Sequence, residues 1–265
     1  MKKLTFGSLF AGIGGFDLGL ERAGMECKWQ VEIDPFAVKV LEKHWPSVKR
    51  YGDIKDVRDP EPVDVICGGF PCQDLSTAGK QKGFSGERSS LYTEMLRIVS
   101  ECRPQYTIFE NVTNLICGDN GRWFATFLYD LAEIGLDAEW HCIQAARLGA
   151  DHERDRVWII AYPTEDGNTE FKKPHPRKNS PLPQRSIFAD KLFDILRGWQ
   201  PLYGRADSQP GIRRVINGLP GGMDRLGGLG NAVVPQIPEL LGRVIIKTHN
   251  KALEMDGQKD ARLSA

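Results

Sequence analysis

The sequence lacks long hydrophobic runs, closely spaced cysteine pairs and net charge. No apolar stretch approaches the roughly 20 residues that a membrane-spanning helix needs, and no basic-then-apolar leader precedes the strand-like sequence at Leu4. The six cysteines are scattered, with no Cys-x-x-Cys pair, which favours reduced thiols over disulfides or a zinc site. The 35 basic and 35 acidic residues cancel, which excludes a globally basic nucleic-acid binder but permits one basic face. We therefore expect a cytoplasmic protein without a bound metal.

What is present is an alternation of strand-like and helix-like segments. Asp34-Pro35 has the form of a helix N-cap followed by proline, and Gly24 is typical of a helix end. Short apolar runs that predict strands lie at 4–10, 27–33, 48–51, 63–67, 106–109, 138–143 and 157–162. Repeated strand–helix units predict an α/β fold with a Rossmann-like, doubly wound, mostly parallel sheet over residues 1–162.

Polar and glycine-rich signals follow five of these strands. A glycine-rich turn over 10–15 follows the first, and Glu32, Asp53, Cys72 and Glu110 lie at or after the ends of later ones. In open α/β sheets, ligands bind beyond the carboxyl ends of the strands. The order of the signals predicts a single site along this edge, with Cys72 placed as a nucleophile would be.

The glycine turn bears on the kind of cofactor. Glu32 lies about 20 residues after the first glycine of the turn, near the end of the second strand, where an acid can bind ribose hydroxyls. The Gly-x-Gly-x-x-Gly spacing of nicotinamide enzymes is absent, because Asp17 stands where the third glycine belongs. The pattern favours a cofactor of mononucleoside size and disfavours a dehydrogenase.

Several motifs, in order, resemble those of the DNA cytosine-5 methyltransferase family. Ser-Leu-Phe-Ala-Gly-Ile-Gly-Gly (8–15), Glu-Ile-Asp (32–34) and Gly-Asp-Ile (52–54) resemble its cofactor motifs. Gly-Phe-Pro-Cys-Gln (69–73), Glu-Asn-Val (110–112) and Arg-Asp-Arg (154–156) resemble its nucleophile, ENV and paired-arginine motifs. Gly-Asn-Ala-Val-Val-Pro (230–235) resembles its last motif, which returns to the cofactor pocket. The family more often has glutamine where this chain has His152.

The resemblance implies the fold of a class I methyltransferase and the cofactor S-adenosylmethionine, with S-adenosylhomocysteine as product. The residues that it assigns to the cofactor are Phe10, Ala11, Gly12, Ile13, Gly14, Glu32, Ile33, Asp53, Ile54, Pro71, Leu91, Asn231 and Val233.

The resemblance also implies methyl transfer to carbon 5 of a cytosine flipped out of duplex DNA. Cys72 would add to carbon 6, Glu110 in protonated form would bind the base, and Arg154 and Arg156 would clamp the base oxygen and nearby phosphates. The two arginines alternate along a strand-like run, so we expect them to point the same way. Expected substrate contacts are Gln73, Ser76, Lys80, Lys82 and Asn111.

The remaining chain divides into three parts. Residues 163–219 are basic and proline-rich, and they stand where the family holds its target-recognition region; this one is small and irregular. Residues 220–250 predict a segment and helix that return to the catalytic domain, and 251–265 predict a flexible tail. We expect a monomer that acts on duplex DNA, encoded by a bacterium or phage. The sequence leaves open whether it has a cognate restriction endonuclease as a partner, protects a phage or marks a host genome.

Two alternatives remain open from the sequence. An RNA cytosine-5 methyltransferase acting on tRNA would share the same core and differ only in the recognition region. A catalytically silent nucleic-acid-binding homologue is disfavoured by the intact Cys72, Glu110 and arginine pair.

Overall fold

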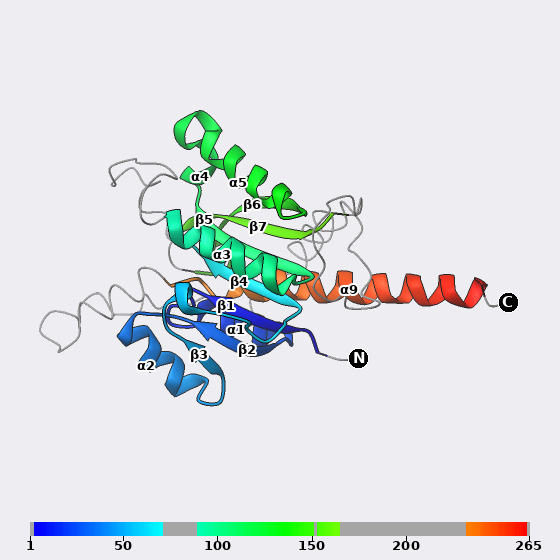
Figure 1. The fold of residues 1–265 in the computed structure, drawn as a ribbon, viewed down its shortest axis with the longest axis horizontal. Coiled ribbons are helices and arrows are strands. Elements are labelled where there is room, and N and C mark those ends of the chain that lie inside the picture. The colour runs from blue at the N-terminus through cyan, green and yellow to red at the C-terminus, as the bar shows by residue number, and fades with distance from the viewer. Residues whose placement is uncertain (1–2, 71–88, 151–152, 165–231, 264–265) are drawn as a thin grey trace, which may run out of the picture.

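The computed structural model describes residues 3–70, 89–150, 153–164 and 232–263 (Figure 1). Within these residues, seven strands form one sheet in the order β3-β2-β1-β4-β5-β7-β6. The strands are β1 (Thr5–Leu9), β2 (Glu26–Val31), β3 (Lys49–Tyr51), β4 (Val65–Gly69), β5 (Tyr106–Val112), β6 (Leu136–Gln144) and β7 (Asp155–Pro163). The pairs from β3 to β5 are parallel, and β7 is antiparallel to both β5 and β6. The predicted α/β fold with a mostly parallel sheet is confirmed.

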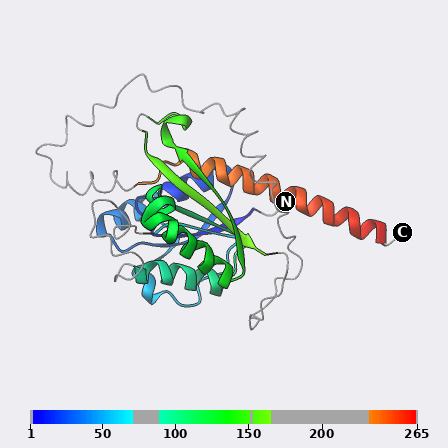
Figure 2. The same ribbon diagram turned by 90° about the horizontal axis from the view of Figure 1, so that it is seen from above.

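Helices cover both faces of the sheet (Figures 1 and 2). One face is covered by the 3-10 helix η1 (Ile54–Asp56) with α3 (Ser89–Cys102), α4 (Asn114–Cys117) and α5 (Arg122–Glu133). The other face is covered by α1 (Gly15–Ala23) and α9 (Gln236–Leu263), while α2 (Pro35–His44) packs near α1 through Leu41 and Trp45. Two short 3-10 helices, η3 (Gly118–Gly121) and η4 (Ala145–Leu148), complete the described elements.

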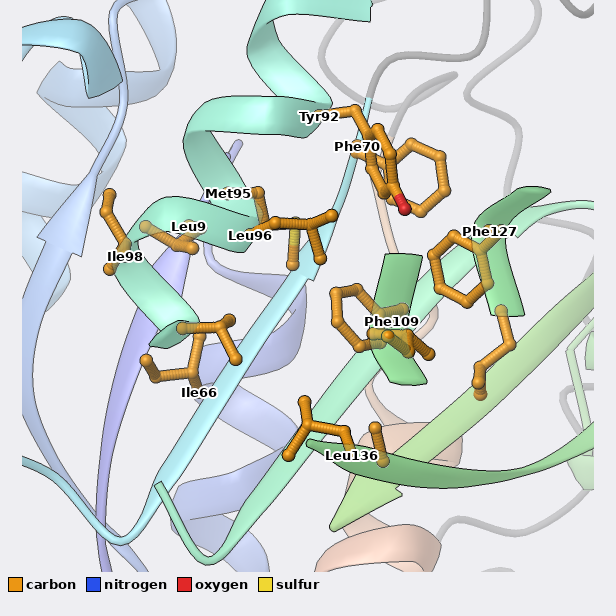
Figure 3. Packing of buried hydrophobic residues seen from close by; sticks show 14 of the residues in the cluster. Leu9, Ile66, Phe70, Tyr92, Met95, Leu96, Ile98, Phe109, Phe127 and Leu136 are labelled. Atoms are coloured by element: carbon orange, nitrogen blue, oxygen red, sulfur yellow. The ribbon is translucent and has the colours of Figure 1, made fainter. Parts of the chain in front are cut away.

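Each face of the sheet has its own apolar core. Figure 3 shows the core under α3 and α5, where Phe70, at the end of β4, packs among other aromatic rings. Its ring centroid lies 5.2 Å from that of Tyr92, 5.7 Å from that of Phe127 and 6.4 Å from that of Phe109. Aromatic pairs at such distances contribute about 0.5–1.5 kcal/mol each beyond the burial of their area. The backbone immediately before Pro71-Cys72 is thus fixed by a side chain in the core.

Glycines allow α1 and α9 to pack closely. A β-carbon at Gly19 would lie 2.4 Å from the Pro235 carbonyl oxygen, and one at Gly15 would lie 2.3 Å from that of Val233. Larger residues at either position would push the helices apart. This packing brings the segment that starts α9 against the start of α1, directly beside the glycine-rich turn.

The structure differs from the local expectations in three places. Strand β5 continues through Glu110 to Val112, because β7 pairs with it along that length. Strand β7 begins at Asp155, so Arg154 precedes it, with φ of 21°, and the alternation expected of the two arginines does not apply. Helix α9 continues past residue 250 to Leu263, through alanine, leucine, lysine and glutamate residues that favour helix; the flexibility of this segment stays a prediction.

Two further observations concern the described residues alone. None of their helices is both long and apolar enough to cross a membrane. No group of three or more histidine, cysteine, aspartate or glutamate side chains among them could hold a metal ion.

Candidate active site

The turn after β1 has a backbone that only a few residue types adopt readily. Phe10, Gly12 and Gly14 all have positive φ, of 52°, 56° and 86°. Gly12 has open space around its missing β-carbon, whereas a β-carbon at Gly14 would lie 2.4 Å from the ring of Trp45. The Ala11 amide donates to the Val31 carbonyl at 3.0 Å, which ties the turn to the end of β2. The result is an open backbone surface at the carboxyl edge of the sheet, with Ala11 buried and Ile13 half-buried.

Glu32 organises this turn from the neighbouring strand. Its Oε2 accepts the Gly12 amide at 2.6 Å, while Oε1 accepts the amides of Ile33 at 2.9 Å and Asp34 at 2.8 Å. A carboxylate has about four acceptor positions, so one remains for a ligand hydroxyl. The adjacent Ile33 side chain is 68% exposed, an apolar surface beside a polar one. This pair can bind a ribose and the face of its base.

The other predicted cofactor residues surround the same edge with different exposures. Asp53 is half-buried and caps η1 by accepting the Lys55 amide at 2.9 Å, so its second oxygen is available. Leu91 is half-buried against the core and Val233 is half-buried beside Gly15. Ile54 is 3% exposed and belongs to the core. Pro71 and Asn231 lie outside the described residues.

Sequence reasoning missed the role of Asp17 beneath the turn. This fully buried carboxylate accepts from Gln30 Nε2 at 2.8 Å, Ser8 Oγ at 3.1 Å and Cys27 Sγ at 3.5 Å. Burial raises its pKa to about 6, although these hydrogen bonds act in the opposite direction. The signal available in the sequence was an acid beside Phe16 on the apolar side of a short helix.

The second half of the edge is formed by β4, β5 and β7. Strand β4 ends at Gly69, which pairs with Glu110 of β5 in the parallel register. A β-carbon at Gly69 would lie 2.7 Å from Glu110 Oε2, so glycine makes room for the carboxylate. Chain continuity places Cys72 three residues beyond Gly69. Cys72 itself and the predicted substrate contacts Gln73, Ser76, Lys80 and Lys82 lie outside the described residues.

Glu110 is a buried acid whose carboxylate receives few interactions to offset the loss of water. Its side chain is 11% exposed, and Arg156 Nε lies 3.1 Å from its Oε1. This contact is an ion pair, and the buried Oε1 has no geometric hydrogen-bond partner among the described residues. Burial raises the pKa of Glu110, with Arg156 and then Arg154 opposing that shift. A carboxyl group in this setting favours its protonated form more than one in water.

The two arginines have different backbone conformations, but both interact electrostatically with Glu110. Arg156 lies in β7 opposite Val112, and its Nη1 also donates to the Asp155 carbonyl at 2.8 Å. Burial and the nearby Arg156 lower the pKa of the half-buried Arg154, which Glu110 partly offsets. The structure therefore brings Glu110, Arg154 and Arg156 together, as the sequence predicts.

Two neighbours support Glu110. Asn111 is buried, and its Nδ2 donates to the Phe70 carbonyl at 3.3 Å, directly before Pro71-Cys72. Its predicted contact with substrate stays a prediction. Trp158, 1% exposed, pairs with Glu110 across β5 and β7, so an indole covers the carboxylate's side of the sheet. Sequence reasoning missed Trp158, because antiparallel pairing of β7 with β5 is not visible in a local pattern.

The chain resembles known proteins over most of its length. A family model described as C-5 cytosine-specific DNA methylase matches residues 4–203. The type II methyltransferase M.BsuFI of Bacillus subtilis is 33% identical over 187 residues, which cover 70% of this chain and 46% of that protein. M.HhaI of Haemophilus parahaemolyticus is 36% identical over 175 residues, which cover 65% and 53%. The chain thus spans about half the length of these curated relatives.

Two solved structures resemble the fold. A putative DNA modification methyltransferase encoded within an Escherichia coli prophage has a TM-score of 0.51 at 28% identity, covering 61% of this chain and 47% of that one. The Entamoeba histolytica methyltransferase EhMeth has a TM-score of 0.61 at 14% identity, covering 93% and 99%. The second likeness bears on the fold alone. With the family model matching 200 residues of strands, turns and site motifs, this chain belongs to the C-5 cytosine-specific DNA methylase family.

Proposed function

We propose that this protein transfers a methyl group from S-adenosylmethionine to carbon 5 of cytosine in duplex DNA. One observation carries the proposal beyond family membership. Glu110 is buried, its Oε1 is ion-paired with Arg156 but has no hydrogen bond among the described residues, and it lies beside Gly69, three residues before Cys72. A protonated carboxyl group there can bind the ring nitrogen N3 of a cytosine whose carbon 6 faces the thiol.

The described residues fit the proposed cofactor. The open backbone at Gly12, the remaining acceptor position of Glu32, the exposed Ile33 and the second oxygen of Asp53 offer groups for a carboxylate tail, a ribose and a purine. S-adenosylmethionine supplies a methyl group made electrophilic by its sulfonium sulfur. The residues of this half bind and orient; none of them needs to exchange a proton.

The chemical steps fall to the other half of the edge. The Cys72 thiolate adds to carbon 6, and the electron pair of the 5,6 double bond forms a bond from carbon 5 to the methyl group, whose bond to sulfur breaks so that S-adenosylhomocysteine leaves. Glu110 gives or shares its proton at N3, which offsets the negative charge that builds on the ring. Loss of the carbon 5 proton to water then restores the double bond and expels the thiolate, and the proton at N3 returns to Glu110.

The arginines and the recognition region serve the DNA. Arg156 and Arg154 hold Glu110 in place and present cationic groups where the base oxygen and neighbouring phosphates would lie. We assign target recognition to residues 163–219 and loop contacts to Lys80 and Lys82. The bacterial type II methyltransferases among the relatives support a bacterial or phage origin. The monomeric state, the cytoplasmic location and a partner restriction endonuclease stay predictions.

A labelling experiment tests the proposal. Purified protein is incubated with tritiated S-adenosylmethionine and either mixed-sequence duplex DNA or tRNA, and Cys72→Ala is assayed in parallel. We expect label in DNA, converted to 5-methylcytosine, and none with Cys72→Ala.

Every other outcome of the labelling experiment contradicts part of the proposal. Label in tRNA alone would assign the activity to RNA, and no label in either substrate would leave a silent nucleic-acid-binding homologue. Full activity of Cys72→Ala would contradict the assigned nucleophile.

A further inference from the structure

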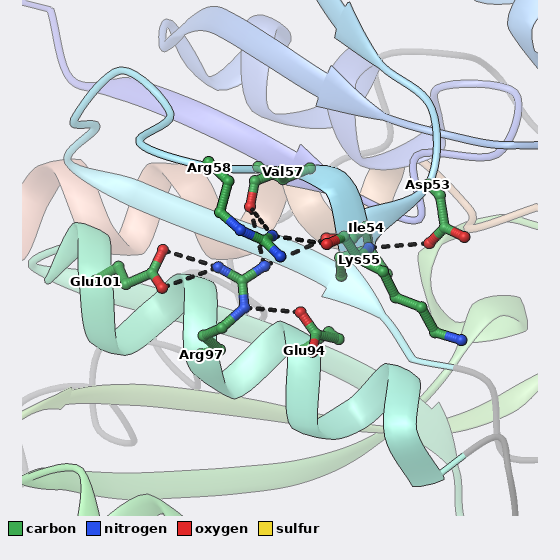
Figure 4. A network of polar contacts seen from close by, with 8 residues as sticks. All are labelled: Asp53, Ile54, Lys55, Val57, Arg58, Glu94, Arg97 and Glu101. Carbon is green, nitrogen blue, oxygen red and sulfur yellow. Dashed lines mark hydrogen bonds and ion pairs between the residues drawn. The ribbon is translucent and has the colours of Figure 1, made fainter.

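Arg97, on α3, lies outside every motif that points to the site, yet it reaches the backbone of the Asp53 turn. Figure 4 shows its guanidinium between α3 and the turn that carries η1. Its Nη2 donates to the carbonyl oxygens of Ile54, at 3.3 Å, and Val57, at 3.0 Å. These carbonyls belong to the segment that directly follows Asp53.

The remaining donors of Arg97 hold the guanidinium in one orientation. Nε donates to Glu94 Oε2 at 2.7 Å, and Nη1 donates to both oxygens of Glu101 at 2.9 Å. The two acids lie one turn before and one turn after Arg97 on the same helix, so α3 itself aims the group. A planar fork with five donors can do this, whereas a lysine ammonium cannot span two carboxylates and two carbonyls.

The turn satisfies only part of its own backbone. The Ile54 carbonyl accepts the Val57 amide at 3.3 Å, whereas the Val57 carbonyl lies at the C-cap, past the end of the 3-10 helix. The contacts of Arg97 with both carbonyls are partly buried. Arg58, from the same turn, donates to the carbonyls of Lys55 and Val57, but it connects the turn only to itself. Ile54 and Val57 anchor the turn by their apolar side chains, and Arg97 supplies the directional bonds that set its rotation.

We propose that Arg97 is a positioning residue for cofactor binding, which orients Asp53 through the carbonyl oxygens of Ile54 and Val57. Asp53 caps η1 through the Lys55 amide, so a rotation of η1 moves its carboxylate. Arg97 is not placed to touch the cofactor or the base. Its loss therefore weakens binding of the cofactor and leaves the chemical step intact. This inference rests on the proposed function of the Asp53 turn.

The test measures initial rates of DNA methylation against S-adenosylmethionine concentration for the wild type, Arg97→Lys and Arg97→Met. Loss of charge-assisted hydrogen bonds predicts a rise in KM for the cofactor of roughly tenfold in Arg97→Lys, and more in Arg97→Met, with kcat within about twofold. The double variant Glu94→Gln, Glu101→Gln keeps Arg97 but releases its orientation, and it should raise KM less. The matched control is Arg243→Lys, which alters a comparable ion pair with Glu239 on α9 and should leave KM unchanged.

Three results separate the possibilities. An unchanged KM in both Arg97 variants, or an equal loss of kcat at unchanged KM, overturns the inference. Circular dichroism and thermal unfolding of each variant show whether it is folded; if Arg97→Met unfolds, Arg97→Lys and the double variant still decide. If the wild type itself labels neither DNA nor tRNA, the proposed function fails, and equilibrium binding of S-adenosylmethionine to the same variants tests Arg97 by itself.

Discussion

Two glutamates at the same edge of the sheet are held in opposite ways. Glu32, at the end of β2, is half-exposed and accepts three backbone amides. Glu110, in β5, is buried with an oxygen that has no hydrogen bond among the described residues. The first has both carboxylate oxygens bonded to backbone amides, whereas burial raises the pKa of the second and favours its neutral form.

The difference between the two glutamates separates the carboxyl edge of the sheet into two parts with different chemistry. On the β1–β3 side, Glu32 and Asp53 each accept backbone amides and keep an acceptor position for a ligand. On the β4–β7 side, Glu110 and Arg156 are paired but incompletely bonded, and a base that enters can complete their contacts. In the proposed function, one half of the edge binds the cofactor with groups that are already oriented, and the other half supplies a proton to the base.

The largest expected effect is on catalysis when Glu110 is made a permanent amide. Glu110→Gln keeps the shape but cannot supply a proton to the ring, so we expect methylation to fall by about 10²-fold or more, with cofactor affinity unchanged. Single-turnover labelling and cofactor binding measure the two effects. Glu42→Gln, an exposed substitution on α2, is the control, and comparable activity of Glu110→Gln would remove the distinction between the two halves.

Glu110 should also give the wild type a pH dependence that Glu110→Gln lacks. Because the pKa of Glu110 is raised on folding, its contribution to stability is present below the ordinary carboxyl pKa and is lost as pH rises through the raised value. In the wild type, the chemical rate should decline on the alkaline side of that raised pKa. A rate profile without this decline would contradict the requirement for a protonated Glu110.

Asp17 separates the effect of burial from that of hydrogen bonding, because it is buried like Glu110 but accepts several hydrogen bonds like Glu32. Its pKa rises from 3.8 to about 6, so its neutral form is favoured on folding, and stability is lost as pH rises through this window. Asp17→Asn removes the titration while keeping partners for Ser8 and Gln30. The difference in unfolding free energy between variant and wild type should grow in favour of the variant, by up to about 3 kcal/mol, between about pH 4 and about pH 7.5. Urea denaturation at both pH values measures it, and a constant difference would show that hydrogen bonding outweighs burial.

The smallest of these effects concerns Glu32. In Glu32→Gln the new NH2 group would face one of the three amide donors, so the turn at Gly12 would lose part of its support. We expect the KM for S-adenosylmethionine to rise roughly tenfold, with little change in kcat. A fall in kcat at constant KM would assign Glu32 to the chemical half.

The sequence predicted the features that depend on neighbouring residues. Strand–helix alternation, the Asp34 cap and the glycine turn follow from local patterns, and the strand ends placed Glu32, Asp53 and Glu110 at one edge. Contacts between distant segments were not predictable in this way. The reach of Arg97 to Ile54 spans 43 positions, and the extension of β5 past Phe109 depends on its pairing with β7.

Arg154 and Asp17 show what local sequence patterns could not predict about the site. The motif predicted the proximity of Arg154 to Glu110, but the alternation argument was wrong, because Arg154 precedes the strand. Asp17 was read only as a departure from a glycine pattern. Its network becomes visible when β1 and β2 place Ser8 and Gln30 beside it.

We propose that the chain after Gly69 brings the Cys72 thiolate to carbon 6 of a cytosine held by Glu110. The direct test is to incubate the protein and S-adenosylmethionine with duplex DNA that carries 5-fluorocytosine. Fluorine at carbon 5 prevents the final elimination, so we expect a protein–DNA complex that survives a denaturing gel, and peptide mapping should show the base joined to Cys72. A complex that forms equally with Cys72→Ala, or no complex with DNA that the wild type methylates, would contradict this proposal.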